Sequence, residues 1–313
     1  MGVKDTIAKQ YMQNSLVFAD LFNYMIYSGR QVIQPDNLYP LDSMAVTVPY
    51  HTAGTESPVQ RERDVFRYLA SMTDDRAAYL LLGIENQSAV HYAMPVRSMV
   101  YDALAYAMQV EETARSHRKQ KDSRGHNAAE YLSGFYKEDR LLPVITAVVY
   151  LSPKPWDGPV CLHDMLMIRE PEMLPFIENY RIHLLTPEGI SEAELERFHS
   201  TLHEVLGFIK YSGDKEKLKA FVTKTPSFLE LEPEAASMIR CYTDLEINIE
   251  EKEGVNMCKA INDMMEDAKE QGIEQGIERG KMEAAKALLD ILKPEVIAQK
   301  VGLPIEVILQ IRG

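Results

Sequence analysis

Residues 79–88 read Tyr-Leu-Leu-Leu-Gly-Ile-Glu-Asn-Gln-Ser and pass from a continuous apolar run into polar residues. An apolar run of this length is typical of a buried strand, although periodicity alone does not distinguish it from a buried helix. Gly83 and the polar residues that follow it favour the strand. Because side chains alternate between the two faces of a strand, Glu85 and Gln87 are expected on one face and Asn86 on the other. A carboxylate and an amide are therefore predicted together at the end of a hydrophobic strand.

A second acidic residue precedes this strand. Residues 61–69, Arg-Glu-Arg-Asp-Val-Phe-Arg-Tyr-Leu, are rich in aromatic, β-branched and charged side chains and predict another strand, which contains Asp64. Residues 72–76 have the composition of a turn. The two strands are therefore predicted to form a hairpin that brings Asp64 close to Glu85 and Gln87. A buried carboxylate needs a partner, commonly a metal ion or a base, because desolvating it alone is costly.

These motifs resemble a known family of nucleases. An acid on one strand followed by Glu-Xaa-Gln on the next is similar to the PD-(D/E)XK nuclease superfamily. The sequences Ile-Glu-Asn-Gln-Ser at 84–88 and Met-Pro-Val-Arg-Ser-Met-Val-Tyr at 94–101 resemble its recombination-promoting nuclease (Rpn) branch, whose members are often labelled transposases. The resemblance covers residues 15–185, and the glycine-rich tail is also similar. It implies an α/β fold, a restriction-endonuclease-like mixed sheet flanked by helices and followed by a helical C-terminal region.

The resemblance also implies an activity, that of a metal-dependent DNA endonuclease that hydrolyses phosphodiester bonds. Asp64 and Glu85 would hold Mg²⁺ or Mn²⁺, because hard carboxylate oxygens suit such ions, and the metal would activate a water molecule for attack on the phosphate. Gln87 stands where many relatives carry a lysine, so it could orient the water or the phosphate but brings no positive charge. Asp20 is a further candidate metal ligand, with a surface or capping carboxylate as the alternative. Asn23 occupies a position where the family has a lysine.

Two groups of residues are candidates for contacting DNA. Arg97 and Tyr101 are four residues apart on a helix expected to begin near Pro95, so they share a face of it. The resemblance implies that this helix packs beside the active site, where Arg97 would bind a phosphate or pair with an acid. Residues 111–130 are locally the most basic stretch and are either a DNA-contacting loop or a solvated one. Its candidate contact residues are Arg115, Arg118, Lys119 and Lys121.

The remaining pattern predicts the order of the elements. Residues 5–27 are expected to form one helix, whose apolar stripe is Leu16, Ala19, Phe22 and Ile26. Residues 141–151 are apolar throughout, as a central strand covered on both faces should be. Together with the strand at 79–88 and the helix after it, they predict a βαβ unit with a parallel pair of strands. The helix stripe of that unit is expected at Val96, Met99, Val100, Ala103, Leu104 and Ala107.

The tail carries a glycine at every fourth residue, namely Gly272, Gly276 and Gly280. Each glycine costs a helix about 1 kcal/mol relative to alanine, so three of them at this spacing need a compensating contact. A helix from about residue 262 to 281 would place them on one face, where another helix could approach closely. A flexible linker is the alternative. We therefore expect a homodimer or higher homo-oligomer in which the tail takes part.

The domain organisation follows from these segments. A nuclease-like domain is predicted at 1–186, a helical extension at 187–260, and the glycine-repeat helix with a small helical tail at 261–313. The chain has 313 residues, of which 46% are hydrophobic and 26% charged, as is ordinary for a soluble globular protein. The longest apolar stretches are too short to predict a membrane span, and the N-terminus lacks the apolar core of a signal peptide.

Composition also bears on the function classes. The three cysteines are scattered and make neither a zinc spacing nor a disulfide framework, so a cytoplasmic location is expected. The net charge of −13 argues against strong non-specific electrostatic binding of nucleic acid. Metal ions and a local basic patch could nevertheless offset the acidic residues. The same charge favours the alternative function, a non-catalytic interaction module that keeps the nuclease fold and assembles through its C-terminal helix.

Overall fold

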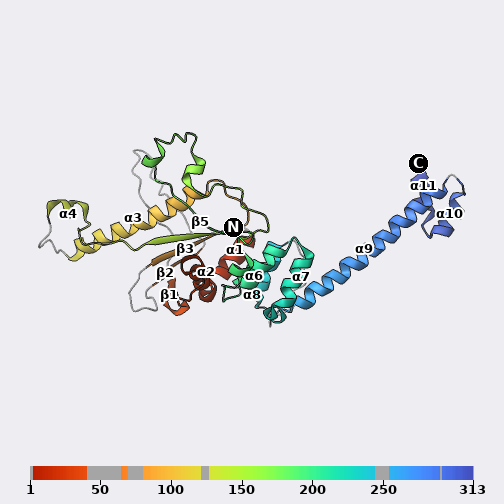
Figure 1. Cartoon of the computed structure of the whole chain (residues 1–313), viewed down its shortest axis with the longest axis horizontal. Coiled ribbons are helices and arrows are strands. Elements are labelled where there is room, and N and C mark those ends of the chain that lie inside the picture. Colours follow the sequence, from red (N-terminus) through yellow and green to blue (C-terminus); the bar gives the residue numbers. More distant parts are fainter. Residues whose placement is uncertain are drawn as a thin grey trace. The chain divides into compact units, whose positions relative to one another are not determined.

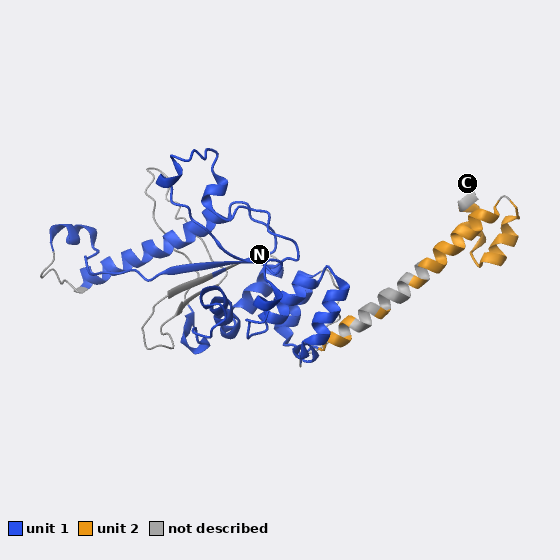
Figure 2. Cartoon of the chain, in the orientation of Figure 1, with its two compact units in different colours: residues 1–245, 249–255 blue, residues 246–248, 256–313 orange. Residues whose placement is uncertain are grey.

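The computed structural model describes residues 3–40, 65–69, 80–120, 127–243, 254–289 and 291–312. They divide into two compact units, one of residues 1–245 with 249–255 and one of residues 246–248 with 256–313 (Figure 2). Most of the segment predicted as a helical extension belongs to the first unit, and the glycine-repeat segment belongs to the second. Across the described ranges, no helix is both long and apolar enough to cross a membrane.

The first unit contains a mixed sheet, five-stranded within the described residues (Figure 1). The strands follow the order β1 (Leu38–Pro40), β2 (Val65–Leu69), β3 (Leu80–Gln87), β4 (Val144–Tyr150) and β5 (His183–Leu185). Neighbours are antiparallel from β1 to β3 and parallel from β3 to β5. The mixed α/β class, the antiparallel pairing of β2 with β3 and the parallel βαβ unit are therefore confirmed.

Helices lie on both sides of this sheet (Figure 1). On one side is α3 (Met94–Gln120), which connects β3 to β4 and packs against β4. On the other are α1 (Val3–Met12), which contacts β3, and α2 (Ser15–Tyr27). Because β4 lies between β3 and β5 and is covered on both faces, nearly every residue in it is buried, as its continuous apolar sequence predicts.

The single helix predicted over residues 5–27 is wrong, because the chain breaks between α1 and α2. The side chain of Asn14 accepts a hydrogen bond of 2.9 Å from the backbone N–H of Leu16 and so caps α2. Asparagine is a favoured N-cap residue, so Asn14 is a local signal for the start of a new helix. The apolar period continues past Asn14, and for this reason the pattern alone predicted one uninterrupted helix. Leu16 consequently lies in the first turn and is 60% exposed, whereas Ala19 and Phe22 are buried as expected.

Asn23 has a structural role that its sequence position did not indicate. Its side chain is fully buried, and its Oδ1 accepts hydrogen bonds from the backbone N–H groups of Val32 (3.1 Å) and Ile33 (2.8 Å). Its Nδ2 donates to the carbonyl oxygen of Ile33 at 2.9 Å. One amide therefore satisfies both backbone groups of a buried residue, which a lysine at this position could not do because it has no acceptor.

The stripe predicted for α3 is partly wrong, since Ala103 and Ala107 are exposed. The buried face includes Met94, Ser98, Tyr101, Asp102 and Ala105. From Ser98 onward these positions follow the helical period of three and four residues, but two of them are polar. A search for apolar side chains alone therefore misplaced the face. Hydrogen bonds from other elements explain how the carboxylate of Asp102 is tolerated there, as the site geometry below shows.

The second half of the first unit is a group of short helices. They are α5 (Glu192–Leu195), α6 (Leu202–Tyr211), α7 (Lys215–Lys224) and α8 (Pro233–Tyr242). Ser191 and Glu194 form a capping box at the start of α5. The remaining short elements are α4 (Ala128–Ser133) and the 3₁₀ turns η1 (Pro35–Asn37), η2 (Leu162–Met165), η3 (Leu174–Phe176) and η4 (Pro226–Leu229).

The second unit consists of α9 (Met257–Leu288), α10 (Pro294–Val301) and α11 (Ile305–Arg312). Ala285, Ile297 and Ile308, one from each helix, form a buried apolar cluster at the end of α9. The helix predicted through the glycine repeat is confirmed, and it is longer than expected. The flexible-linker alternative is therefore wrong. A Cβ added at Gly276 or Gly280 would meet nothing within 4 Å, so no intramolecular contact requires glycine at these two positions.

Close packing of α6 on α7 gives a stability prediction. A Cβ added at Gly207 would lie 2.2 Å from Cζ of Phe221, whereas one added at Gly213 meets nothing within 4 Å. Gly207→Ala should lower the free energy of unfolding by about 1–3 kcal/mol, because overpacking outweighs the helical preference of alanine. Gly213→Ala is the control and should stay within about 0.5 kcal/mol. Urea unfolding measures both, and equal stabilities would show that α6 and α7 are not packed as described.

Candidate functional site

The carboxyl ends of β3 and β4 lie side by side, and two of the predicted site residues, Glu85 and Gln87, are at this end of β3. Gln87, the last residue of β3, pairs with Tyr150, and its carbonyl oxygen accepts a hydrogen bond of 2.9 Å from the N–H of Leu151. The Gln87 side chain is half-buried, and its Nε2 donates to the carbonyl oxygen of Asn86 at 2.9 Å. Parallel strands of α/β sheets commonly bind ligands just beyond such ends.

Glu85 lies two residues before Gln87 and pairs with Val148. The side chain of Glu85, and Asp64 altogether, fall outside the described residues. What the structure does describe is the pairing of their sequence neighbours, because Val65 is the direct antiparallel partner of Ile84. Val148 itself is buried in an apolar cluster with Met94 and Ile182. A carboxylate placed next to such a cluster needs a cation or hydrogen-bond donors to remain ionised.

Arg97 and Tyr101 share one face of α3, as predicted. Nε of Arg97 donates a hydrogen bond of 3.2 Å to the Tyr101 hydroxyl, and the guanidinium lies 5.6 Å from the centre of the ring. Tyr101 is buried whereas Arg97 is half-buried. Their hydrogen bond therefore connects a partly exposed side chain of α3 to a buried one. Arg97 lies in the first turn of α3, and Met94 at the start of that helix packs against Val148, the β4 partner of Glu85.

A buried acid on the same helix was missed by the sequence analysis. Asp102 accepts hydrogen bonds through Oδ1 from the Thr146 hydroxyl (2.6 Å) and through Oδ2 from the Tyr180 hydroxyl (2.7 Å). These bonds connect α3, the centre of β4 and the segment before β5. Charge-assisted bonds of this kind are among the stronger ones in proteins, so the cluster fixes how α3 lies on the sheet.

Asp20 is not a surface carboxylate, because it is only 2% exposed. Its Oδ2 accepts three hydrogen bonds, from the N–H of His199 (2.9 Å), the N–H of Ser200 (2.8 Å) and the hydroxyl of Ser200 (2.7 Å). The carboxylate therefore fixes α2 to the turn before α6. Among the side chains that the structure describes, which include neither Asp64 nor Glu85, no group of three or more acidic, His or Cys residues could hold a metal ion.

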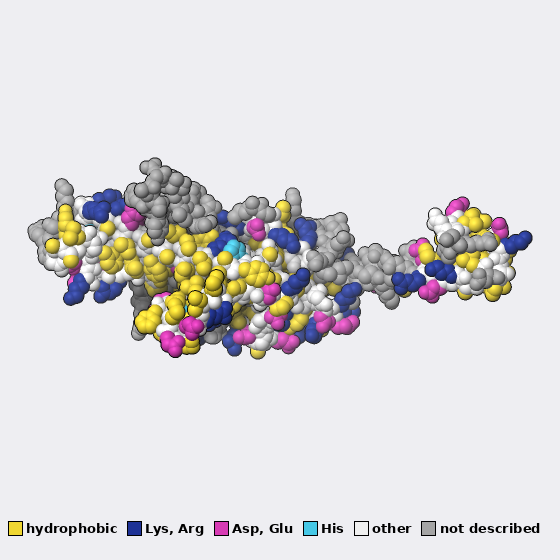
Figure 3. Space-filling model, turned by 90° about the horizontal axis from the view of Figure 1, so that it is seen from above, with side chains coloured by type: hydrophobic (Ala, Val, Ile, Leu, Met, Phe, Trp, Pro, Cys, Tyr) yellow, Lys and Arg dark blue, Asp and Glu magenta, His cyan; other side chains and the backbone are white. Residues whose placement is uncertain are grey.

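The basic candidates up to Lys119 lie on α3, so the loop expected for this stretch, whether DNA-contacting or solvated, is wrong for residues 111–120. Arg115 pairs with Glu111 at 2.6 Å, and Arg118 and Lys119 are exposed near the end of α3, where Lys and Arg side chains gather (Figure 3). Lys121 lies outside the described residues. At about 1.5 Å per residue, Arg118 is about 32 Å along α3 from Arg97. The structure therefore separates the two groups of predicted DNA-contacting residues.

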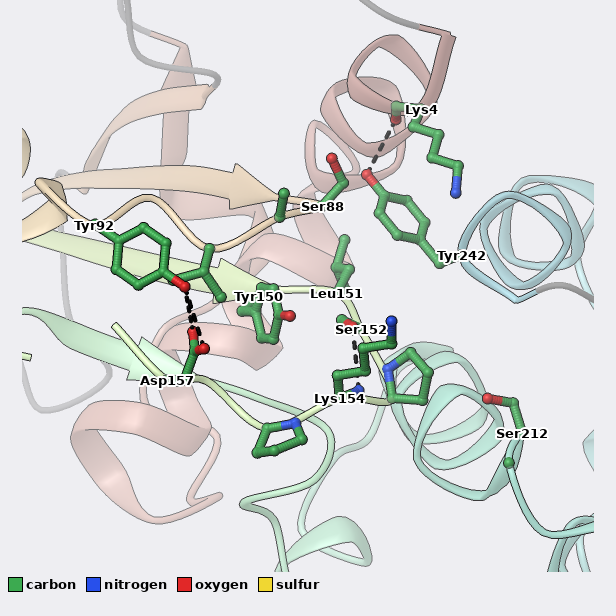
Figure 4. Close-up of a pocket in the computed structure, with 15 residues that line it drawn as sticks. Lys4, Ser88, Tyr92, Tyr150, Leu151, Ser152, Lys154, Asp157, Ser212 and Tyr242 are labelled. Carbon is green, nitrogen blue, oxygen red and sulfur yellow. Dashed lines mark hydrogen bonds between the residues drawn. The ribbon is translucent and has the colours of Figure 1, made fainter. Parts of the chain in front are cut away.

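A cavity of about 600 Å³ opens at the carboxyl ends of β3 and β4 (Figure 4). Ser88 and Ser152, which follow the two strands closely, line it. The Tyr92 hydroxyl donates to both carboxylate oxygens of Asp157, at 3.1 and 3.2 Å, and this hydrogen bond raises the pKa of Tyr92. No periodic pattern in the sequence predicts this cavity, because its walls come from α1, two strand ends, the loop after β4 and the helical segment after residue 200.

The Asp102 cluster yields a prediction. Tyr180→Phe should lower the free energy of unfolding by about 1–3 kcal/mol, because a buried carboxylate loses a hydrogen-bond donor. Tyr131→Phe removes the same atom from an exposed ring of α4 and should stay within about 0.5 kcal/mol. Chemical unfolding followed by circular dichroism compares the two. Equal effects would mean that the bond from Tyr180 to Asp102 contributes nothing to stability.

Comparisons with known proteins were made at three levels. Protein-family models, curated proteins and solved structures all return no match to this chain. The function is therefore argued from the residues at the end of β3 and from the motifs that they carry.

Proposed function

We propose that the first unit is a metal-dependent DNA endonuclease with a restriction-endonuclease-like fold, of the Rpn type. The observation that carries this proposal is the direct pairing of Val65 with Ile84, the residues adjacent in sequence to Asp64 and Glu85. Continuing this antiparallel register by one residue would pair Asp64 with Glu85. Directly paired residues have Cα atoms about 4.5–5.5 Å apart, which is close enough for two carboxylates on one face to share a cation.

The surroundings of this pair support a cation. Position 85 faces Val148 across the parallel ladder, and Val148 packs with Met94 and Ile182. Two carboxylates beside apolar side chains repel each other and lose hydration, so they need a positive partner. When bound, Mg²⁺ or Mn²⁺ would supply the charge that polarises the scissile phosphate and lowers the pKa of an attacking water.

The other residues of the site take positioning roles in this proposal. Gln87 exchanges its hydrogen bond to the Asn86 carbonyl for one to the water or to the phosphate, without supplying charge. Arg97, half-buried at the start of α3, holds a phosphate by its guanidinium while Tyr101 fixes its direction. The basic end of α3 is about 32 Å further along, close to one turn of a DNA duplex of about 34–36 Å. Both groups can therefore contact one duplex.

The test is the loss of one carboxylate. Glu85→Ala should reduce Mg²⁺-dependent cleavage of DNA by at least about 100-fold, because the metal loses one of its two ligands. The melting temperature should stay the same or rise, since clustered acids repel without their cation. Glu178→Ala removes an exposed carboxylate elsewhere and is the matched control, which should cleave like the parent. Cleavage by Glu85→Ala at the parent rate would show that the proposed site is wrong.

A second candidate function is an interaction module that assembles through α9, without catalysis. One observation favours it: Ile273 and Ile277 are 53% and 55% exposed, next to Gly276 and Gly280 with open space around them. Exposed apolar side chains beside glycines let the backbones of two helices approach closely. We propose a homodimer or higher homo-oligomer formed by this face, which is also compatible with nuclease activity because two joined sites could cut both strands.

Removing the tail tests this assembly. Deletion of residues 267–313 should reduce the mass in solution to that of one chain, as measured by sedimentation equilibrium. The double variant Ile273→Ser, Ile277→Ser should weaken association in the same direction, because it removes apolar area from the contact. The control is Glu278→Ser, Arg279→Ser, which alters two exposed polar residues of the same helix. An unchanged oligomer after the deletion would show that α9 is only a solvated helix.

A further inference from the structure

The cavity beyond β3 and β4 carries two lysines that no predicted function uses. Lys4 comes from α1, and Lys154 comes from the loop after β4; both are exposed and line the cavity. Neither forms a salt bridge with a residue in the described part of the chain. The carboxylate of the cavity, Asp157, instead accepts the hydroxyl of Tyr92. In a chain of net charge −13, two lysines without carboxylate partners in one cavity form a local site for an anion.

The cavity also has aromatic surfaces. Tyr92 is 60% exposed at one end, and Tyr242 lies with Lys4 at the other, with Lys154 between them (Figure 4). The Tyr242 hydroxyl donates to the backbone carbonyl of Lys4 at 3.2 Å, and the Lys4 ammonium lies 5.8 Å from the centre of the Tyr242 ring, so the ring is fixed beside the cation. Cationic groups that follow a backbone, combined with rings on which bases stack, are the features by which proteins bind single-stranded nucleic acid.

The volume decides between a single strand and a duplex. A cavity of about 600 Å³ falls within the usual range of small-ligand pockets, about 300–1,000 Å³. It suits one or two nucleotides of a single strand and is too small for a duplex. It begins at Ser88, directly after Gln87, so a strand in it would continue past the end of β3.

We propose that this cavity binds a nucleoside phosphate unit, with the phosphate between Lys4 and Lys154 and the base on the ring of Tyr92. The inference rests on the proposed function in taking that unit to be part of the DNA strand that leads to the β3 site. The shared chemistry, a phosphate attached to a nucleoside, could also come from a free nucleotide. The binding experiment therefore includes both sources.

The experiment measures binding without cleavage. Fluorescence anisotropy of a labelled 12-residue oligothymidylate is recorded in EDTA at several salt concentrations. The double variant Lys4→Ala, Lys154→Ala should bind at least fivefold more weakly. The slope of the logarithm of affinity against the logarithm of salt concentration should become shallower by about 0.7, because the two lysines hold one phosphate and each lost phosphate contact to a single strand contributes about 0.7. The double variant Lys219→Ala, Lys224→Ala makes the same charge change on the exposed surface of α7 and should remain within twofold of the parent.

Two further measurements separate the alternatives. Tyr92→Ala should weaken the oligonucleotide fivefold or more, because a stacked base loses its ring. Thymidine monophosphate and inorganic phosphate are then used as competitors. Displacement by the monophosphate at concentrations comparable to the oligonucleotide identifies a free nucleotide as the ligand, whereas displacement only by oligonucleotide identifies the strand. Both results support the nucleoside phosphate site.

Other outcomes overturn the inference. Absence of oligonucleotide and nucleotide binding by the parent protein would do so, as would equal affinities for the two lysine double variants. Failure of the proposed function is distinguishable, because it is read from cleavage by Glu85→Ala. Normal cleavage by that variant, together with lysine-dependent binding, would reject the β3 metal site and keep the cavity. Lysine-independent binding together with loss of cleavage by Glu85→Ala would reject the cavity and keep the metal site.

Discussion

The parallel pairing of β3 with β4 is the constraint on which the first unit depends. Parallel neighbours cannot be joined by a tight turn, so the chain must cross one face of the sheet, and α3 makes this crossing. The crossing brings the carboxyl ends of both strands to one edge, where Gln87 accepts a hydrogen bond from Leu151. Gln87, the lysine cavity and Met94 at the start of α3, which packs on Val148 of β4, are near this edge because of that one topological requirement.

The polar contacts between α3 and the sheet explain why the helix lies where it does. Asp102 is held by Thr146 of β4 and by Tyr180, which adjoins the apolar cluster around Val148. An unpaired carboxylate in this layer would be costly, so the helix position must satisfy it. Tyr101 directly precedes Asp102, and Arg97 lies one turn before Tyr101, so the same requirement fixes the position of this pair on α3. Structural hydrogen bonds inside the layer thus determine where the proposed phosphate contact is placed.

Strong, continuous patterns were predictable from the sequence, and long-range contacts were not. The strands β3 and β4 follow from apolar runs, and α9 follows from its regular spacing through three glycines. The break at Asn14 was missed because a local cap interrupts the helix without interrupting the apolar period. The buried face of α3 was misplaced because Asp102 is tolerated only through Thr146 and Tyr180, which are distant in sequence. The roles of Asp20 and Asn23 likewise depend on partners that no local pattern reveals.

Charge is the remaining constraint on any nuclease function. A chain of net charge −13 cannot hold DNA by its overall field, so binding must be concentrated at a few sites. The need for local positive charge is greater because of Gln87, which is neutral at a position where many members of the resembled family have a lysine. Lys4 and Lys154 line the cavity at these strand ends, and Arg97 lies in the first turn of α3, so all three can supply positive charge. In the proposed site, the positive charge that is absent at position 87 of β3 is therefore supplied by neighbouring elements of the fold.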